Sequence, residues 1–131
     1  MGKAVLISIR PERYKKIANG EETVEVRKPR PNLKPPFRCY IYCTSGTIIG
    51  EFICRKIDRV THGGDGYGWH ISGLKVYDAP FELSEFRRPC KHDLYCENCA
   101  MYMNHCGICG NPALHLCRPP QNWYYVAEKE D

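Results

Sequence analysis

The 131-residue sequence contains no long apolar run. No stretch approaches the ~18 consecutive apolar residues that a membrane-spanning helix needs. The start, MGKAVLISIRPERYKK, also lacks the apolar centre and the small-residue cleavage site of a secretory signal peptide. We therefore expect a cytoplasmic protein with no membrane partner. The length suits a single domain over residues 1–131, large enough to bury its own core.

The sequence also lacks internal repeats, and it has only one good helix signal. This helix is predicted at residues 11–19, because Pro11 suits its first position and Gly20 suits the left-handed turn that follows. The remaining elements are predicted to be short strands, at residues 4–9, 23–27, 38–43, 48–57, 69–77 and 122–128. Turn signals rather than crossover helices follow nearly every strand. We therefore predict an α+β fold, a small and mostly antiparallel β-barrel with the short helix packed on it.

Cysteine, in contrast, is abundant, with nine residues in the chain. An odd number would leave one thiol over in a full disulfide framework, and clustered cysteines in a reducing compartment more often bind metal. Six of the nine lie in residues 90–117, where apolar residues are few and periodicity is weak. We predict that residues 88–118 are an insertion between two barrel strands, stabilised by a metal ion instead of a core. The other three cysteines lie at apolar strand positions and are predicted to be core residues: Cys39, Cys43 and Cys54.

Two CxxC pairs give the most direct set of metal ligands. Two residues between the cysteines allow a tight turn to aim both thiolates at one ion. We predict about one structural Zn²⁺, bound by Cys96, Cys99, Cys106 and Cys109. Alternate ligands are Cys90, His92, His105, His115 and Cys117, which together with the first four would suffice for a second zinc. An iron–sulfur cluster and a set of free or oxidised thiols are the alternatives.

The charge is unevenly distributed. Residues 1–60 carry 13 basic and 6 acidic side chains, net +7, whereas residues 61–131 carry 6 basic and 9 acidic side chains, net −3. The densest basic run has no acidic residue within it and consists of Arg27, Lys28, Arg30, Lys34 and Arg38. Such a patch attracts polyanions through counterion release. It favours a nucleic-acid partner, and a merely solvated loop is the alternative.

Residues 23–27 alternate along their predicted strand, so that the polar side chains share the face opposite to the valines: Thr23, Glu25 and Arg27. Arg10 ends the strand that we expect to be its neighbour. Together, Arg10, Glu25 and Arg27 could offer a carboxylate to the amino group of a base and a guanidinium to a phosphate. The alternative is that Glu25 and Arg27 form a structural ion pair.

Aromatic residues could add a stacking surface for a base, formed by Tyr67, Trp69, Trp123 and Tyr124. The alternative is that the tryptophans belong to the core. The predicted ligand-binding residues are therefore Arg10, Glu25, Arg27, Lys28, Arg30, Lys34 and Trp69.

Two segments resemble the ASCH family, a branch of the PUA-like β-barrels. The first is ISIRPERYKKIANGEETVEVRK at residues 7–28. It follows the family pattern of a helix and then Gly-x-Lys-x-x-Glu-x-Arg, which Gly20, Glu25 and Arg27 match. The second is RPPQNWYYV at residues 118–126, which, like LKVYDAPFELSEF at residues 74–86, is similar to phage and prophage members.

This resemblance implies a PUA-like barrel that binds RNA or a modified nucleotide in a cleft beside the barrel. Some family members are small amidohydrolases that act on N4-acylated cytidine, with a catalytic lysine after the helix and a threonine at the position of Glu25. Glu22 stands here at the lysine position. We therefore expect a binding domain rather than an enzyme. The alternative is an amidohydrolase that uses Glu22, Thr23 and Glu25, and the cysteine-rich insertion offers a surface for a protein partner.

Overall fold

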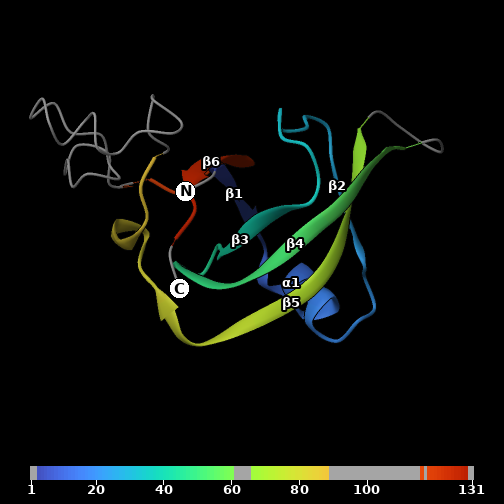
Figure 1. Cartoon of the computed structure of the whole chain (residues 1–131). Coiled ribbons are helices and arrows are strands. Elements are labelled where there is room, and N and C mark those ends of the chain that lie inside the picture. The colour runs from blue at the N-terminus through green and yellow to red at the C-terminus, as the bar shows by residue number, and fades with distance from the viewer. Residues whose placement is uncertain (1–2, 61–65, 89–115, 117, 130–131) are drawn as a thin grey trace, which may run out of the picture.

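The computed structural model of the chain describes residues 3–60, 66–88, 116 and 118–129. Its elements are β1 (Lys3–Ile9), α1 (Pro11–Ala18), β2 (Val24–Arg27), β3 (Phe37–Cys43), β4 (Thr47–Arg59), β5 (Tyr67–Phe81), the 3-10 helix η1 (Leu83–Glu85) and β6 (Trp123–Ala127). The predicted helix and the six predicted strands are confirmed, and β4 and β5 extend beyond their predicted bounds at both ends. Figure 1 shows these elements along the chain.

The six strands form one sheet in the order β2-β5-β4-β3-β1-β6. Strands β1 and β3 pair in parallel, and the other four neighbouring pairs are antiparallel. The prediction of a mostly antiparallel fold is therefore confirmed. The sheet is curved into a half-barrel whose two edges are β2 and β6 (Figure 1).

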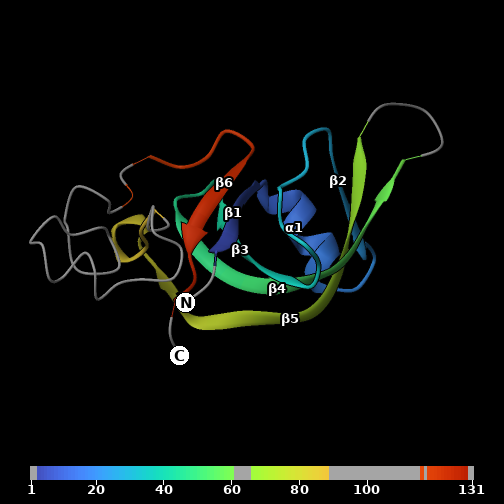
Figure 2. The ribbon, with the colours of Figure 1, turned by 45° about the horizontal axis from the view of Figure 1, so that its top comes forward.

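The curvature arises largely in the long pair formed by β4 and β5. Their register shifts three times, after Ile48, Glu51 and Cys54, and such irregularities bend a strand and increase its twist. Gly50 lies at the first shift, where an added Cβ would stand 2.6 Å from the carbonyl oxygen of Lys75. Figure 2 shows the curved strands β4 and β5 running alongside α1.

One side of the sheet packs against α1. Successive residues of β1 point to opposite faces, so Val5 and Ile7 enter this core while Ala4 and Leu6 enter the other. The helix contributes the buried Ile17, and Tyr14 packs beside it. The apolar run of β1 is thus explained by a strand that is covered on both faces.

The opposite side of the sheet is covered by the chain that follows β5. Its core includes Phe86 and Leu116, and the backbone N–H of Leu116 donates to the carbonyl of Phe86 at 3.1 Å. The N–H of Ala127 donates to the carbonyl of Arg87 at 2.8 Å. The predicted insertion therefore begins and ends at neighbouring points between β5 and β6, and both points are fixed to the sheet.

The described cysteines belong to the core, as predicted. Cys39, Cys43 and Cys54 are buried and free. Burial raises the pKa of Cys54 to about 11, and it also raises that of Cys39 well above its ordinary value. Both thiols are therefore protonated at neutral pH, which makes them poor metal ligands and poor nucleophiles.

All nine predicted metal ligands, from Cys90 to Cys117, lie outside the described residues. Within the described ranges, no three His, Cys, Asp or Glu side chains gather closely enough to hold a metal ion. The same part of the chain contains no helix with the length and apolar character needed to cross a membrane.

Candidate nucleic-acid interface

A buried carboxylate lies at the centre of the predicted acid–base face. Glu25 is only 2% exposed, and each of its oxygens accepts a hydrogen bond from a different arginine. Arg13 Nη2 donates to Oε1 at 2.9 Å, and Arg27 Nε donates to Oε2 at 2.8 Å. Arg13 also pairs with Glu22 at 3.3 Å, and its bond to Glu25 raises the pKa of its guanidinium. The charge of Glu25 is thus compensated within the protein.

Arg27 also connects the two edges of the sheet. From β2, its Nη1 donates to Asn122 Oδ1 at 2.6 Å and to the Asn122 carbonyl at 3.2 Å. Its Nη2 donates to the carbonyl of Ser8 in β1 at 2.7 Å. Since β2 and β6 are the sheet edges, and Asn122 immediately precedes β6, this guanidinium spans the opening of the half-barrel. We call the group of Glu25, Arg27, Asn122 and Ser8 the edge clasp.

The edge clasp decides which face of β2 points inward. The polar face is turned into the protein, whereas Val26 on the opposite face is 49% exposed. The observed geometry is therefore that of the structural ion pair between Glu25 and Arg27. A ligand-binding role for these two residues stays a prediction.

The residues of the enzymatic alternative do not form an evident catalytic arrangement. Both oxygens of Glu25 have cationic partners, Glu22 pairs with Arg13, and Thr23 is exposed. A general base needs a lone pair directed at the proton that it removes. The amidohydrolase alternative stays a prediction.

The prediction that the strand before Arg10 lies beside β2 in the sheet is wrong, because β1 lies between β3 and β6. The end of β1 meets β2 through the bond from Arg27 to the Ser8 carbonyl. The Arg10 side chain is exposed, and its carbonyl accepts the N–H groups of Arg13 and Tyr14 at the start of α1. Strand order depends on long-range pairing, and the local pattern around Arg10 contains no signal of it.

The predicted stacking surface is also corrected. Trp69 is 0% exposed, lies opposite Glu25 in the β2–β5 register, and meets Phe37 and Trp123 edge-to-face at centroid distances of 6.0 and 5.8 Å. It is a core residue and is not available to stack on a base. Tyr124 follows Trp123 in β6 and therefore packs against the opposite core. The four aromatic residues thus form no single platform.

The cations of the basic run are of two kinds, those with a carboxylate partner and those without one among the described residues. Arg38 lies in β3, where its Nε is 3.1 Å from Glu51 Oε2 and 3.4 Å from Glu128 Oε2, so its charge is compensated. Lys28, Arg30 and Lys34 are exposed on the loop from 28 to 36 and have no carboxylate partner among the described residues. Within the basic run, the cations without a carboxylate partner therefore lie on this loop.

The loop is attached to the barrel at several points. The backbone N–H of Asn32 donates to the hydroxyl of Tyr125 at 2.7 Å, and Leu33 packs against the core. The Arg30 guanidinium lies 5.5 Å from the ring centre of Tyr67, which is within the range of a cation–π contact. These contacts hold the loop so that its charges are presented together.

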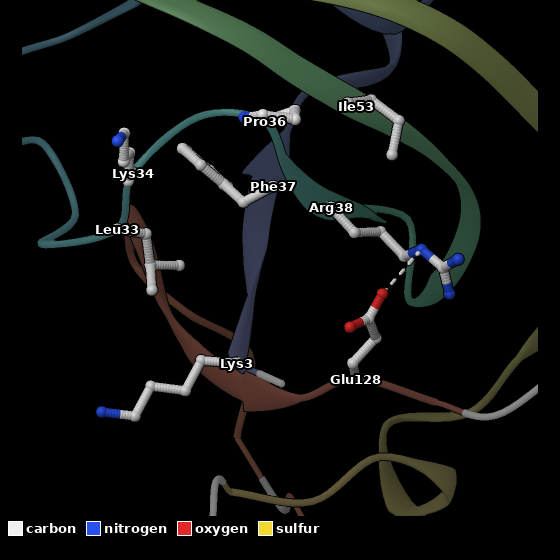
Figure 3. Close-up of a pocket in the computed structure, with 8 residues that line it drawn as sticks. All are labelled: Lys3, Leu33, Lys34, Pro36, Phe37, Arg38, Ile53 and Glu128. Carbon is white, nitrogen blue, oxygen red and sulfur yellow. Dashed lines mark ion pairs between the residues drawn. The ribbon is translucent and has the colours of Figure 1, made fainter. Parts of the chain in front are cut away.

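Beside the loop lies a pocket of about 330 Å³. It is lined by Lys3, Leu33, Lys34, Pro36, Phe37, Arg38, Ile53 and Glu128 (Figure 3). Lys34 is one of the predicted ligand-binding residues, whereas Lys3 and Glu128 were not predicted. These two residues come from opposite ends of the chain and meet because β1 pairs with β6.

Sequence reasoning also missed Arg13, Ser8 and Asn122. The helical pattern places Arg13 in α1 but does not indicate which way its guanidinium points. The opposite charges of Arg13 and Glu22 or Glu25 could have suggested an ion pair. Many other pairs of oppositely charged residues in the chain are equally plausible by this criterion. Ser8 acts through its backbone carbonyl, so its side chain gives no signal.

Comparison with known proteins finds structural likeness only. No family model matches the chain, and no curated protein matches it in sequence. The solved ASCH protein of Zymomonas mobilis is 17% identical, with a TM-score of 0.60 over 95% of this chain and 88% of that one. A mutant of the same protein is 16% identical, with a TM-score of 0.60 over 95% of this chain and 91% of that one. The described part of the chain, with its curved six-stranded sheet and helix α1, therefore has the fold of these ASCH proteins.

Proposed function

We propose that this protein binds RNA through the loop between β2 and β3. The observation that carries the proposal is the separation of charges: Arg27 and Arg38 are compensated internally, whereas Lys28, Arg30 and Lys34 are exposed without carboxylate partners in the described part of the chain. Unpaired cations on an anchored loop suit a phosphate backbone. The ASCH-like fold and the resemblance of residues 7–28 to that family support the same proposal, and a modified nucleotide is the smaller ligand of the same chemistry.

The affinity for RNA is expected to fall steeply with salt, because each phosphate contact releases counterions. In a plot of log affinity against log salt, Arg30→Ala and Lys34→Ala should each make the slope shallower by about one unit. Lys75→Ala is the matched control. Lys75 is exposed on β5 and has no ion pair among the described residues, so its removal should leave the slope unchanged. Fluorescence anisotropy with a single-stranded RNA at several salt concentrations measures the slope. A slope near zero, or no binding at low salt, would refute an RNA-binding role.

We also propose that residues 88–118 bind one structural zinc ion. The spacing of Cys96, Cys99, Cys106 and Cys109 supports this, and thiolates at CxxC spacing suit a closed tetrahedral site. Elemental analysis of protein purified without chelator should find about one zinc per chain, and Cys99→Ser should reduce this content. The barrel should stay folded in Cys99→Ser, because both cores of the sheet consist largely of residues outside the insertion. Protein without bound metal would contradict the proposal.

A further inference from the structure

The pocket beside the basic loop has an apolar lining. Leu33, Pro36, Phe37 and Ile53 provide it. Lys3 is the first residue of β1, whereas the Ser8 carbonyl that binds Arg27 is near its end. The pocket is thus at the other end of β1 from the edge clasp. Its volume of about 330 Å³ lies at the lower end of the range for small-ligand sites.

The polar groups around the pocket are arranged on two sides. Figure 3 shows Lys3 and Lys34 on one side and the Arg38–Glu128 ion pair on the other. Lys34 is exposed, and the Lys3 ammonium lies 5.8 Å from the ring centre of Tyr125. One side therefore favours an anion, and the other contains a carboxylate.

The carboxylate of Glu128 has one oxygen available for a ligand. Arg38 approaches Oε2 at 3.4 Å, while Oε1 has no partner among the described residues. The ion pair with Arg38 holds the side chain beside the pocket. An ionised carboxylate oxygen accepts hydrogen bonds and does not donate them, so the ligand must supply an N–H or O–H group at this point.

We propose that this pocket binds one nucleobase of the RNA, and that Glu128 selects a base with an exocyclic amino group. The apolar lining receives the base, the Lys34 side accepts its phosphate, and Glu128 Oε1 accepts the amino N–H. Cytosine offers that donor at N4, whereas uracil presents a carbonyl oxygen at the same position and would face the carboxylate with a second acceptor. The inference rests on the proposed RNA binding and adds a base preference to it.

Cytosine and uracil make a matched pair for the test, because their rings are nearly equal in size and differ at this edge. Oligocytidine and oligouridine of equal length are compared by fluorescence anisotropy at one salt concentration. We expect about tenfold tighter binding of oligocytidine, as for one charge-assisted hydrogen bond. Glu128→Gln should reduce the ratio of the two affinities to about twofold or less. A neutral amide both donates and accepts hydrogen bonds and can therefore bind either base.

Lys34→Ala is the control that separates charge from base selection. It should weaken both oligomers alike and keep their ratio. Glu128→Gln is expected to fold, because Arg38 keeps its ion pair with Glu51, and circular dichroism checks this. Equal, salt-dependent binding of the two oligomers would overturn the base preference and leave RNA binding standing. Absence of binding by both would overturn the two proposals together, and an unchanged ratio in Glu128→Gln would show that Glu128 is not the selecting group.

Discussion

Replacing Arg27 with alanine is expected to lower the free energy of unfolding by about 3–5 kcal/mol. The Glu25 side chain is 2% exposed and that of Arg27 is 15% exposed, so the variant would leave a buried carboxylate that has lost one of its two cationic partners. The variant also removes the bonds from β2 to Ser8 in β1 and to Asn122 just before β6. Urea denaturation followed by circular dichroism measures the loss.

Arg13→Ala is the matched control for this prediction. It removes the other guanidinium that binds Glu25, but the Arg13 side chain is 45% exposed, so water can take its place beside the carboxylate, and the cost should be clearly smaller than that of Arg27→Ala. In a Glu25→Gln background, the cost of Arg27→Ala should shrink, because no buried charge is left unpaired. A loss below about 1 kcal/mol for Arg27→Ala in the otherwise unchanged protein would show that Glu25 is solvated and that the edge clasp does not stabilise the fold.

Phe86→Ala is expected to destabilise the protein by about 3–5 kcal/mol. Phe86 is 1% exposed, and its ring meets Tyr40 edge-to-face at a centroid distance of 4.7 Å and Phe81 at 5.8 Å. The Lys129 ammonium lies 5.1 Å from the same ring. Truncation would leave a cavity in the core that fixes both ends of the cysteine-rich insertion.

Phe81→Ala serves as the comparison for Phe86→Ala, since Phe81 is only partly buried in the same core. It should cost clearly less than Phe86→Ala in the same denaturation experiment. The contrast with Cys99→Ser is also informative, because loss of the metal site is expected to leave the barrel folded. Equal stability of Phe86→Ala and the unchanged protein would mean that the segment after β5 does not contribute to the core.

Much of the fold could be predicted from local pattern. Pro11 and Gly20 mark the two ends of α1, and the apolar run at residues 4–9 predicts a strand, which the structure buries on both faces. Turn signals between the strands predict a mostly antiparallel sheet. These features depend on backbone geometry and side-chain alternation within a few residues, which the sequence contains directly.

The sequence could not predict the order of the strands in the sheet. It also could not predict which face of a strand with alternating polar and apolar residues is buried. Alternation separates Glu25 and Arg27 from Val24 and Val26, but it does not say which pair is buried. The polar pair is inside because Arg27 finds acceptors on Ser8 and Asn122, and Asn122 is 95 positions away in the chain.

The same reason divides the basic run. In the sequence, Arg27 and Arg38 belong to the same basic run as Lys34. In the structure, however, Arg27 forms an ion pair with Glu25 and Arg38 forms one with Glu51. The composition of the run was determined by the sequence, whereas the tertiary structure decided which charges remain for a ligand. A charge is available to a ligand only where no opposite charge lies within hydrogen-bond distance. The order of the strands in the sheet determines which charges that are distant in sequence come that close.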